Sequence, residues 1–136
     1  MFERSLFSFS HRFPLVIEDL LALPNDKQII AEGFGLLPEL VHPILSSHYQ
    51  AVWFVPTETF KWDSMARRGK PSFAKMTNDP EKAKTNLFTR DMMLADYYRK
   101  LVLSYGYTLH EIDDSHSAEE MTDLVDWHFA KYRESP

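Results

Sequence analysis

Cysteine is absent from the 136-residue chain, and glycine is scarce, with four glycines against eight prolines. The lack of cysteine excludes a disulfide scaffold, thiolate zinc ligands and a cysteine nucleophile. No apolar run approaches the roughly 20 residues that span a bilayer, and the first ten residues lack the features of a secretory signal. We therefore expect a cytoplasmic protein with no membrane partner.

The apolar content is sufficient for a folded core. Apolar residues make up 44% of the chain and aromatic residues 14%, which excludes a disordered chain. At the usual domain size of roughly 100–200 residues, this length predicts a single domain over residues 1–136. Six histidines are present, but none are spaced as zinc ligands usually are, so we predict no metal site built from them.

Charge is unevenly distributed along the chain, whose net charge is −5. Residues 61–90 carry eight Lys or Arg and three Asp or Glu, a local balance of +5, whereas residues 111–136 carry eight acids and two bases, a balance of −6. A basic middle segment on an acidic protein favours a small anionic or phosphorylated ligand over nucleic acid. A solvated basic surface explains the same charges equally well.

An N-terminal helix is predicted from the apolar pattern. Apolar residues recur at spacings of four and three from Phe2 to Leu23, which is typical of one helix face. Pro14 predicts a kink, or a break and restart, near residues 11–14. The sequence Pro-Asn-Asp at residues 24–26 predicts the end of this helix.

The remaining pattern alternates strands with helices. Three apolar runs are predicted as strands: residues 27–32, 51–55 and 107–112. Helices are predicted at residues 37–46, from Thr57 or Thr59 to Arg68, from Asn78 to Tyr105 and from the capping box Ser117–Glu120 onward, with a mobile basic loop over residues 69–77. This alternation predicts an α/β fold with a parallel sheet and helices on both faces, although three strands are few for such a sheet.

Polar residues follow each predicted strand: Glu32-Gly33, Pro56-Thr57 and Asp113-Asp114. In open parallel sheets, ligands bind beyond the carboxyl ends of the strands. A carboxylate at such an end can hold Mg²⁺ through water or accept a proton from a substrate hydroxyl. The structural alternative is that these acids cap helices or bond to loops.

Three arginines are candidates for binding phosphate. Arg90 shares the apolar stripe of the long predicted helix, with Asn86 one turn away, and Arg67 and Arg68 end the preceding helix. Guanidinium groups bind phosphate oxygens bidentately. The alternatives are that Arg67 and Arg68 complement the helix dipole and that Arg90 pairs locally with Asp91.

These segments, in this order, resemble P-loop kinases that phosphorylate nucleosides, nucleotides or other small metabolites. The segments that carry the resemblance are residues 29–33, residues 51–56 with the helix ending at Arg68, residues 86–91, and residues 107–113 with the capping box that follows. Residues 29–33 are similar to the family's third strand, and residues 51–56 with the helix after them to its fourth strand and arginine-bearing lid. Residues 86–91 are similar to the lid's returning helix, and residues 107–113 with the capping box to the last strand and the C-terminal helix. The resemblance covers the chain from about Phe13.

The resemblance implies ATP-dependent phosphoryl transfer with ATP and Mg²⁺ as cofactors. It places Glu32 near the magnesium or the acceptor, and it places Arg67, Arg68 and Arg90 on the transferring phosphate. It further implies ligand-binding roles for Gly33, Thr57 and Asn86, and an adenine-side loop at Asp113, Asp114 and Ser115. Such chemistry consists mainly of positioning and charge neutralisation.

One departure limits this expectation. The sequence contains no GxxxxGK[ST] phosphate loop, and the strand and helix that flank it in the family are also missing. We therefore expect little kinase turnover from this chain, and kinase activity only if such a segment is joined to it. The missing strand would leave an open seam in the sheet, unless the chain is part of a longer one or a rearrangement closes the gap. We predict that a second copy fills it, giving a homo-oligomer formed through that seam or through the N-terminal helix. The alternative is a non-catalytic anion-binding protein or an oligomeric subunit.

Overall fold

The computed structural model describes residues 1–68 and 76–134, so residues 69–75 of the predicted basic loop lie outside it. The residues described form a mixed α/β structure, 65% helical, with a small parallel sheet of two strands. Its internal contacts divide it into two compact units, residues 1–44 and 45–136. We describe each unit by itself, and the single-domain assignment stays a prediction.

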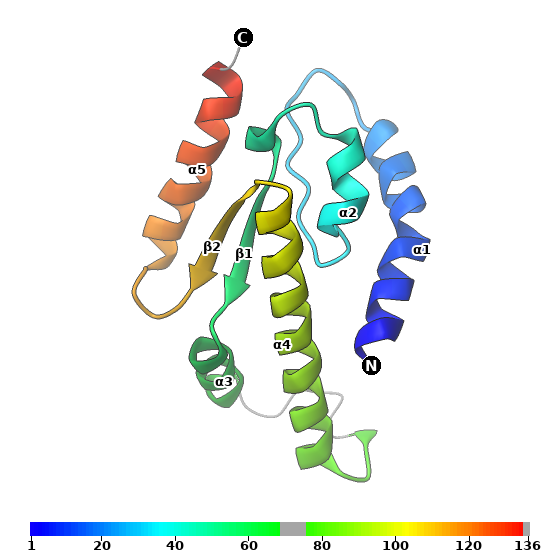
Figure 1. The fold of residues 1–136 in the computed structure, drawn as a ribbon, viewed down its shortest axis with the longest axis vertical. Coiled ribbons are helices and arrows are strands. Elements are labelled where there is room, and N and C mark those ends of the chain that lie inside the picture. Colours follow the sequence, from blue (N-terminus) through cyan, green and yellow to red (C-terminus); the bar gives the residue numbers. More distant parts are fainter. Residues whose placement is uncertain (69–75, 135–136) are drawn as a thin grey trace. The chain divides into compact units, whose positions relative to one another are not determined.

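The N-terminal unit begins with α1 (Phe2–Leu21), drawn in blue in Figure 1. Pro14 lies inside this helix without breaking it, so the predicted alternative of a break and restart is wrong. Proline removes one hydrogen bond from the ladder, but its fixed φ is compatible with a helix. No residue of α1 is buried, although its apolar residues follow one face.

The strand predicted at residues 27–32 does not form, and this prediction is wrong. These residues are irregular and exposed, with Ile30 at 72% exposure. The predicted helix after them is shorter than expected: α2 spans Pro38–Val41 and is followed by a 3₁₀ turn, His42–Ile44. Pro43 explains the short helix, because it lacks the N–H that would bond the carbonyl four residues earlier.

The C-terminal unit contains the sheet. Strands β1 (Val52–Pro56) and β2 (Thr108–Ile112) pair in parallel, with Val52 opposite Thr108 and Pro56 opposite Ile112. Both strands and their parallel arrangement confirm the prediction. Because the first predicted strand is not formed, the described residues hold two strands instead of three.

Three longer helices complete this unit: α3 (Glu58–Arg67), α4 (Pro80–Ser104) and α5 (Ala118–Glu134). Their bounds follow local chemistry. The Thr57 hydroxyl accepts a hydrogen bond from the Phe60 amide at 3.3 Å, which caps α3. Ser117 and Glu120 form the predicted capping box that opens α5, with bonds of 3.2 and 2.7 Å.

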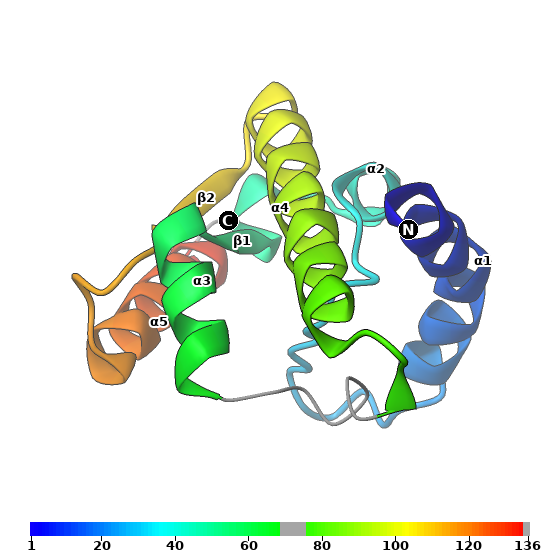
Figure 2. The same cartoon turned by 90° about the horizontal axis from the view of Figure 1, so that it is seen from below.

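Helices α4 and α5 lie on opposite faces of the sheet (Figures 1 and 2). Successive residues of a strand point to opposite faces of the sheet. Glu111 of β2 binds Arg99 of α4 at 2.9 Å. Its neighbour His110 interacts electrostatically with His128 of α5. The core of the unit consists of buried residues from both layers: Val55, Met65, Leu94, Ala95, Tyr98, Val102, Tyr107 and His128.

Candidate functional site

Polar residues gather where β1 and β2 end. We call this site the carboxyl edge and define it by Thr57, Arg67, Asp113, Asp114 and Ser115. The backbone N–H of Thr57 donates to the Ile112 carbonyl at 2.9 Å. The segments that follow the two strands therefore begin side by side, as expected for parallel strands.

Arg67 and Asp114 meet across the carboxyl edge. A guanidinium nitrogen of Arg67, at the end of α3, lies 3.3 Å from a carboxylate oxygen of Asp114, in the loop after β2. Both side chains are about 60% exposed, so solvent screens the pair and its net stabilisation is small. The Arg67 guanidinium also lies 5.8 Å from the centre of the Phe60 ring. The structure thus brings together two residues that the sequence singled out separately.

A tight turn positions Asp113, the other acidic residue of the carboxyl edge. The Ser115 amide donates to Asp113 at 2.9 Å, and the Ser115 hydroxyl bonds to the same carboxylate oxygen. The Ser115 hydroxyl also lies 2.8 Å from Nδ1 of His116. The hydrogen bonds from Ser115 lower the pKa of Asp113 below its ordinary value. Asp113 is therefore an ionised, solvent-exposed carboxylate at neutral pH.

Arg90 is engaged elsewhere in the unit. Its Nε donates to Oδ1 of Asp91 at 2.9 Å, and Nζ of Lys61 lies 2.7 Å from Oδ2 of the same carboxylate. The structure thus contains the local pairing that the sequence left open as an alternative for Arg90. Lys61 was not singled out by sequence reasoning, because no local spacing connects it to Asp91, thirty positions away.

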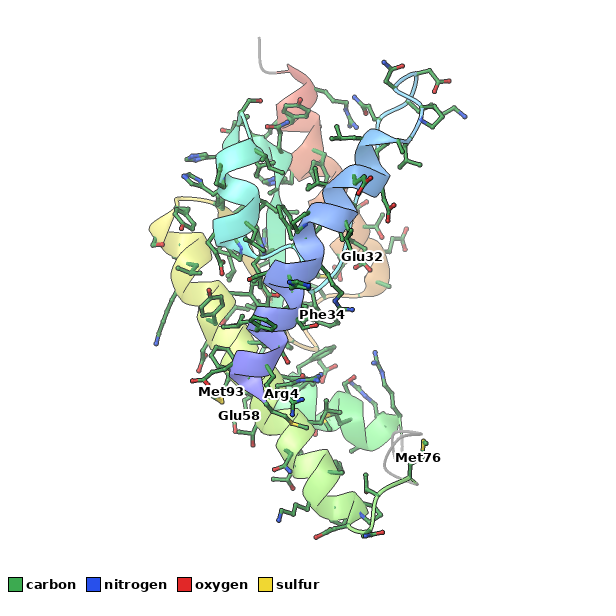
Figure 3. The ribbon with its side chains drawn as sticks, turned by 90° about the vertical axis from the view of Figure 1, so that its right-hand side faces the viewer. Arg4, Glu32, Phe34, Glu58, Met76 and Met93 are labelled. Carbon is green, nitrogen blue, oxygen red and sulfur yellow. The ribbon has the colours of Figure 1, made fainter. Side chains whose placement is uncertain are left out.

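The other predicted site residues are dispersed. Arg68 ends α3 as its C-cap, and the side chain of Asn86 is exposed on α4. Glu32 and Gly33 belong to the N-terminal unit, in the segment between α1 and α2 where Figure 3 labels Glu32. Gly33 has φ of +154°, a conformation that side-chain-bearing residues rarely adopt. The carboxyl edge is therefore built by the C-terminal unit alone.

Two features of the C-terminal unit were not anticipated. An open hollow of about 470 Å³ is lined by Glu58, Thr59, Trp62, Asp63 and Phe88. Also, His128 is 1% exposed and its Nε2 has no hydrogen-bond partner among the residues that the structure describes. Burial of an unpartnered side-chain nitrogen has no signal in the spacing of residues along the sequence.

No family model, curated protein or solved structure matches this chain. Within residues 1–68 and 76–134, no helix is long and apolar enough to cross a membrane. No group of three His, Asp or Glu side chains in that part of the chain is placed to hold a metal ion.

Proposed function

We propose that this chain binds a small phosphorylated ligand at the carboxyl edge, as a kinase-like α/β domain. The observation that carries the proposal is the approach of Arg67 from α3 to Asp114 after β2, at the carboxyl ends of two parallel strands. This is the edge at which open parallel sheets bind ligands. The segments from residue 51 onward that resemble P-loop kinases support the same assignment; residues 29–33, which form no strand, do not.

The chemistry of the edge suits a phosphate group. The Arg67 guanidinium has donors in a planar fork that matches two phosphate oxygens. A phosphate would replace Asp114 as its partner, because a carboxylate and a phosphate compete for the same donors. Both side chains are largely exposed, so this exchange requires no rearrangement of the core.

ATP and Mg²⁺ enter the proposal through the resemblance. Asp113 and Asp114 supply carboxylate oxygens of the kind that hold Mg²⁺ directly or through water. When bound, the magnesium ion would neutralise charge on the phosphates. The sequence contains no GxxxxGK[ST] loop, so the backbone amides and lysine that cradle a triphosphate are not supplied by its residues. We propose ligand binding with little phosphoryl transfer by this chain alone.

Calorimetric titration of the chain tests this function, with inorganic phosphate, AMP and ATP–Mg²⁺ as separate ligands. We expect saturable binding of at least one of them and a rise in melting temperature with ligand concentration. If the Arg67→Ala variant binds the ligand with the same affinity as the original chain, the ligand does not bind at the carboxyl edge. The absence of binding by all three would overturn the phosphate assignment.

A second candidate function is that of an oligomeric subunit. Its support is α1, which exposes Phe7 at 73% and Leu15 at 58% and has no buried residue. The segment after α1 also exposes Ile29 at 46% and Ile30 at 72%. We propose that a second copy of the chain covers this apolar surface of the N-terminal unit, because apolar surface of this kind drives association. Light scattering at micromolar concentration should give a mass of at least two chains. The mass of a single chain would contradict association through this surface.

A further inference from the structure

We propose that the hollow between α3 and α4 binds a small organic ammonium ion. We call this site the aromatic hollow and define it by its lining residues, Glu58, Thr59, Trp62, Asp63 and Phe88. The hollow is open to solvent, with a volume of about 470 Å³. The inference is independent of the phosphate ligand proposed above.

Two aromatic rings form the apolar part of the hollow. Trp62 of α3 and Phe88 of α4 pack edge to face, with ring centres 5.0 Å apart and an interplanar angle of 86°. Trp62 nevertheless remains 46% exposed. This arrangement leaves indole surface accessible, and an indole face attracts cations more strongly than the other aromatic side chains do.

An ammonium group of the chain itself already lies beside this ring. Nζ of Lys84 lies 5.0 Å from the centre of the Trp62 ring. Lys84 is on the first turns of α4 and has a long flexible side chain, so an external ammonium ion could replace it. The lysine therefore marks the kind of group that the site accepts.

Two carboxylates give the hollow the matching charge. Glu58 and Asp63 line it together with the rings. Lys61, on the same helix, does not offset them, because its ammonium group is held by Asp91 at 2.7 Å. Methyl groups of a quaternary ammonium ion would contact the rings while the carboxylates balance its charge.

The aromatic hollow is separate from the carboxyl edge. Trp62 and Arg67 are five residues apart on α3, which places them about 140° apart around the helix axis. An anionic ligand beside Arg67 and a cationic ligand beside Trp62 would therefore occupy different faces of α3. The two proposals can fail independently.

Titration with choline tests the inference, with its neutral isostere, in which carbon replaces the quaternary nitrogen, as the matched ligand. The signals of the three indole N–H groups report binding by NMR. We expect choline to shift the Trp62 signal saturably and to bind at least about threefold more tightly than the isostere. Equal affinity for the two ligands, or no saturable shift, would overturn the proposal.

Variants locate the site. Trp62→Ala should abolish choline binding, Glu58→Gln should weaken it, and Lys84→Met should strengthen it by removing the internal competitor. Trp127→Ala is the control: Trp127 is also exposed, with Nζ of Lys131 3.3 Å from its ring centre, but it does not line the hollow. Choline binding that survives Trp62→Ala would contradict the assignment. If Trp62→Ala fails to fold, an affinity for choline that Glu58→Gln leaves unchanged would contradict the assignment instead.

Discussion

The ammonium nitrogen of Lys61 on α3 lies 2.7 Å from Oδ2 of Asp91 on α4, and Arg90 binds the other oxygen of the same carboxylate. The Lys61 and Asp91 side chains are only 24% and 17% exposed. One carboxylate thus receives two cations and connects α3 to α4 through side chains thirty positions apart in the sequence. From this arrangement we predict a structural role for Arg90 and Asp91 in the C-terminal unit.

Replacing Asp91 by Asn should therefore destabilise the C-terminal unit. The substitution leaves two partly buried cations without their counter-charge, and we expect a loss of about 1–3 kcal/mol in the free energy of unfolding. Urea denaturation followed by circular dichroism measures it. The control is Asp96→Asn, which breaks the exposed pair of Asp96 and Arg99 on one helix and should cost less than about 1 kcal/mol. Equal losses in the two variants would contradict the structural role.

Gly106 provides a second prediction. It ends the α4 segment with φ of +73°, and a Cβ atom there would lie 3.4 Å from Cε1 of His48. Gly106→Ala should lower stability by about 1–2 kcal/mol, because the left-handed conformation is costly for a residue with a side chain. Gly35→Ala serves as control, since Gly35 has no positive φ and a Cβ atom there would meet Phe9 at 3.9 Å. A urea midpoint unchanged by Gly106→Ala would contradict the assigned backbone conformation.

Stability should also depend on the protonation of His128. Burial lowers the pKa of His128 below its ordinary value of 6.5, and nearby His110 and Lys131 act in the same direction, while a hydrogen bond with the Ala51 backbone opposes them. As the pH falls below about 6.5, the unfolded chain takes up a proton before the folded chain does. The free energy of unfolding should then decrease, by at most about 1.4 kcal/mol per pH unit for this residue, until the pH reaches the folded pKa.

Urea denaturation at about pH 7.5 and about pH 5.5 measures this effect, since both values lie above the ordinary pKa range of carboxylates. The stability difference between the two pH values should be smaller in His128→Gln than in the original chain. His11→Gln is the control, because His11 is exposed in the N-terminal unit. An unchanged difference in His128→Gln would show that His128 does not control the pH dependence.

The helices and both strands of the C-terminal unit were predictable because local chemistry determines them. Thr57, Asp79 and Ser117 cap the three helices with their side chains, and Gly106 supplies the conformation that ends α4. Each of these signals acts over a few residues. The parallel pairing of β1 and β2 followed from the helical crossover between them.

The strand expected at residues 27–32 shows where such reasoning stops. A strand requires a neighbour for its backbone hydrogen bonds, and an apolar run such as Ile29-Ile30 does not reveal whether one is present. The same limit applies to the site. The sequence made Arg67 and Arg90 equal candidates for binding phosphate. In the structure, Arg67 contacts Asp114, whereas Arg90 binds its neighbour Asp91. The aromatic hollow was missed because Trp62 and Phe88 come from different helices.

The affinity for inorganic phosphate of two variants at the carboxyl edge tests the central claim most directly. Arg67→Ala removes the donor and should weaken binding by about 1–3 kcal/mol, whereas Asp114→Asn removes the competing carboxylate and should strengthen it. Arg12→Ala, on α1 in the N-terminal unit, should leave the affinity unchanged. Opposite changes in the two edge variants are the predicted result; equal affinities in all three variants and the original chain would contradict phosphate binding at the carboxyl edge.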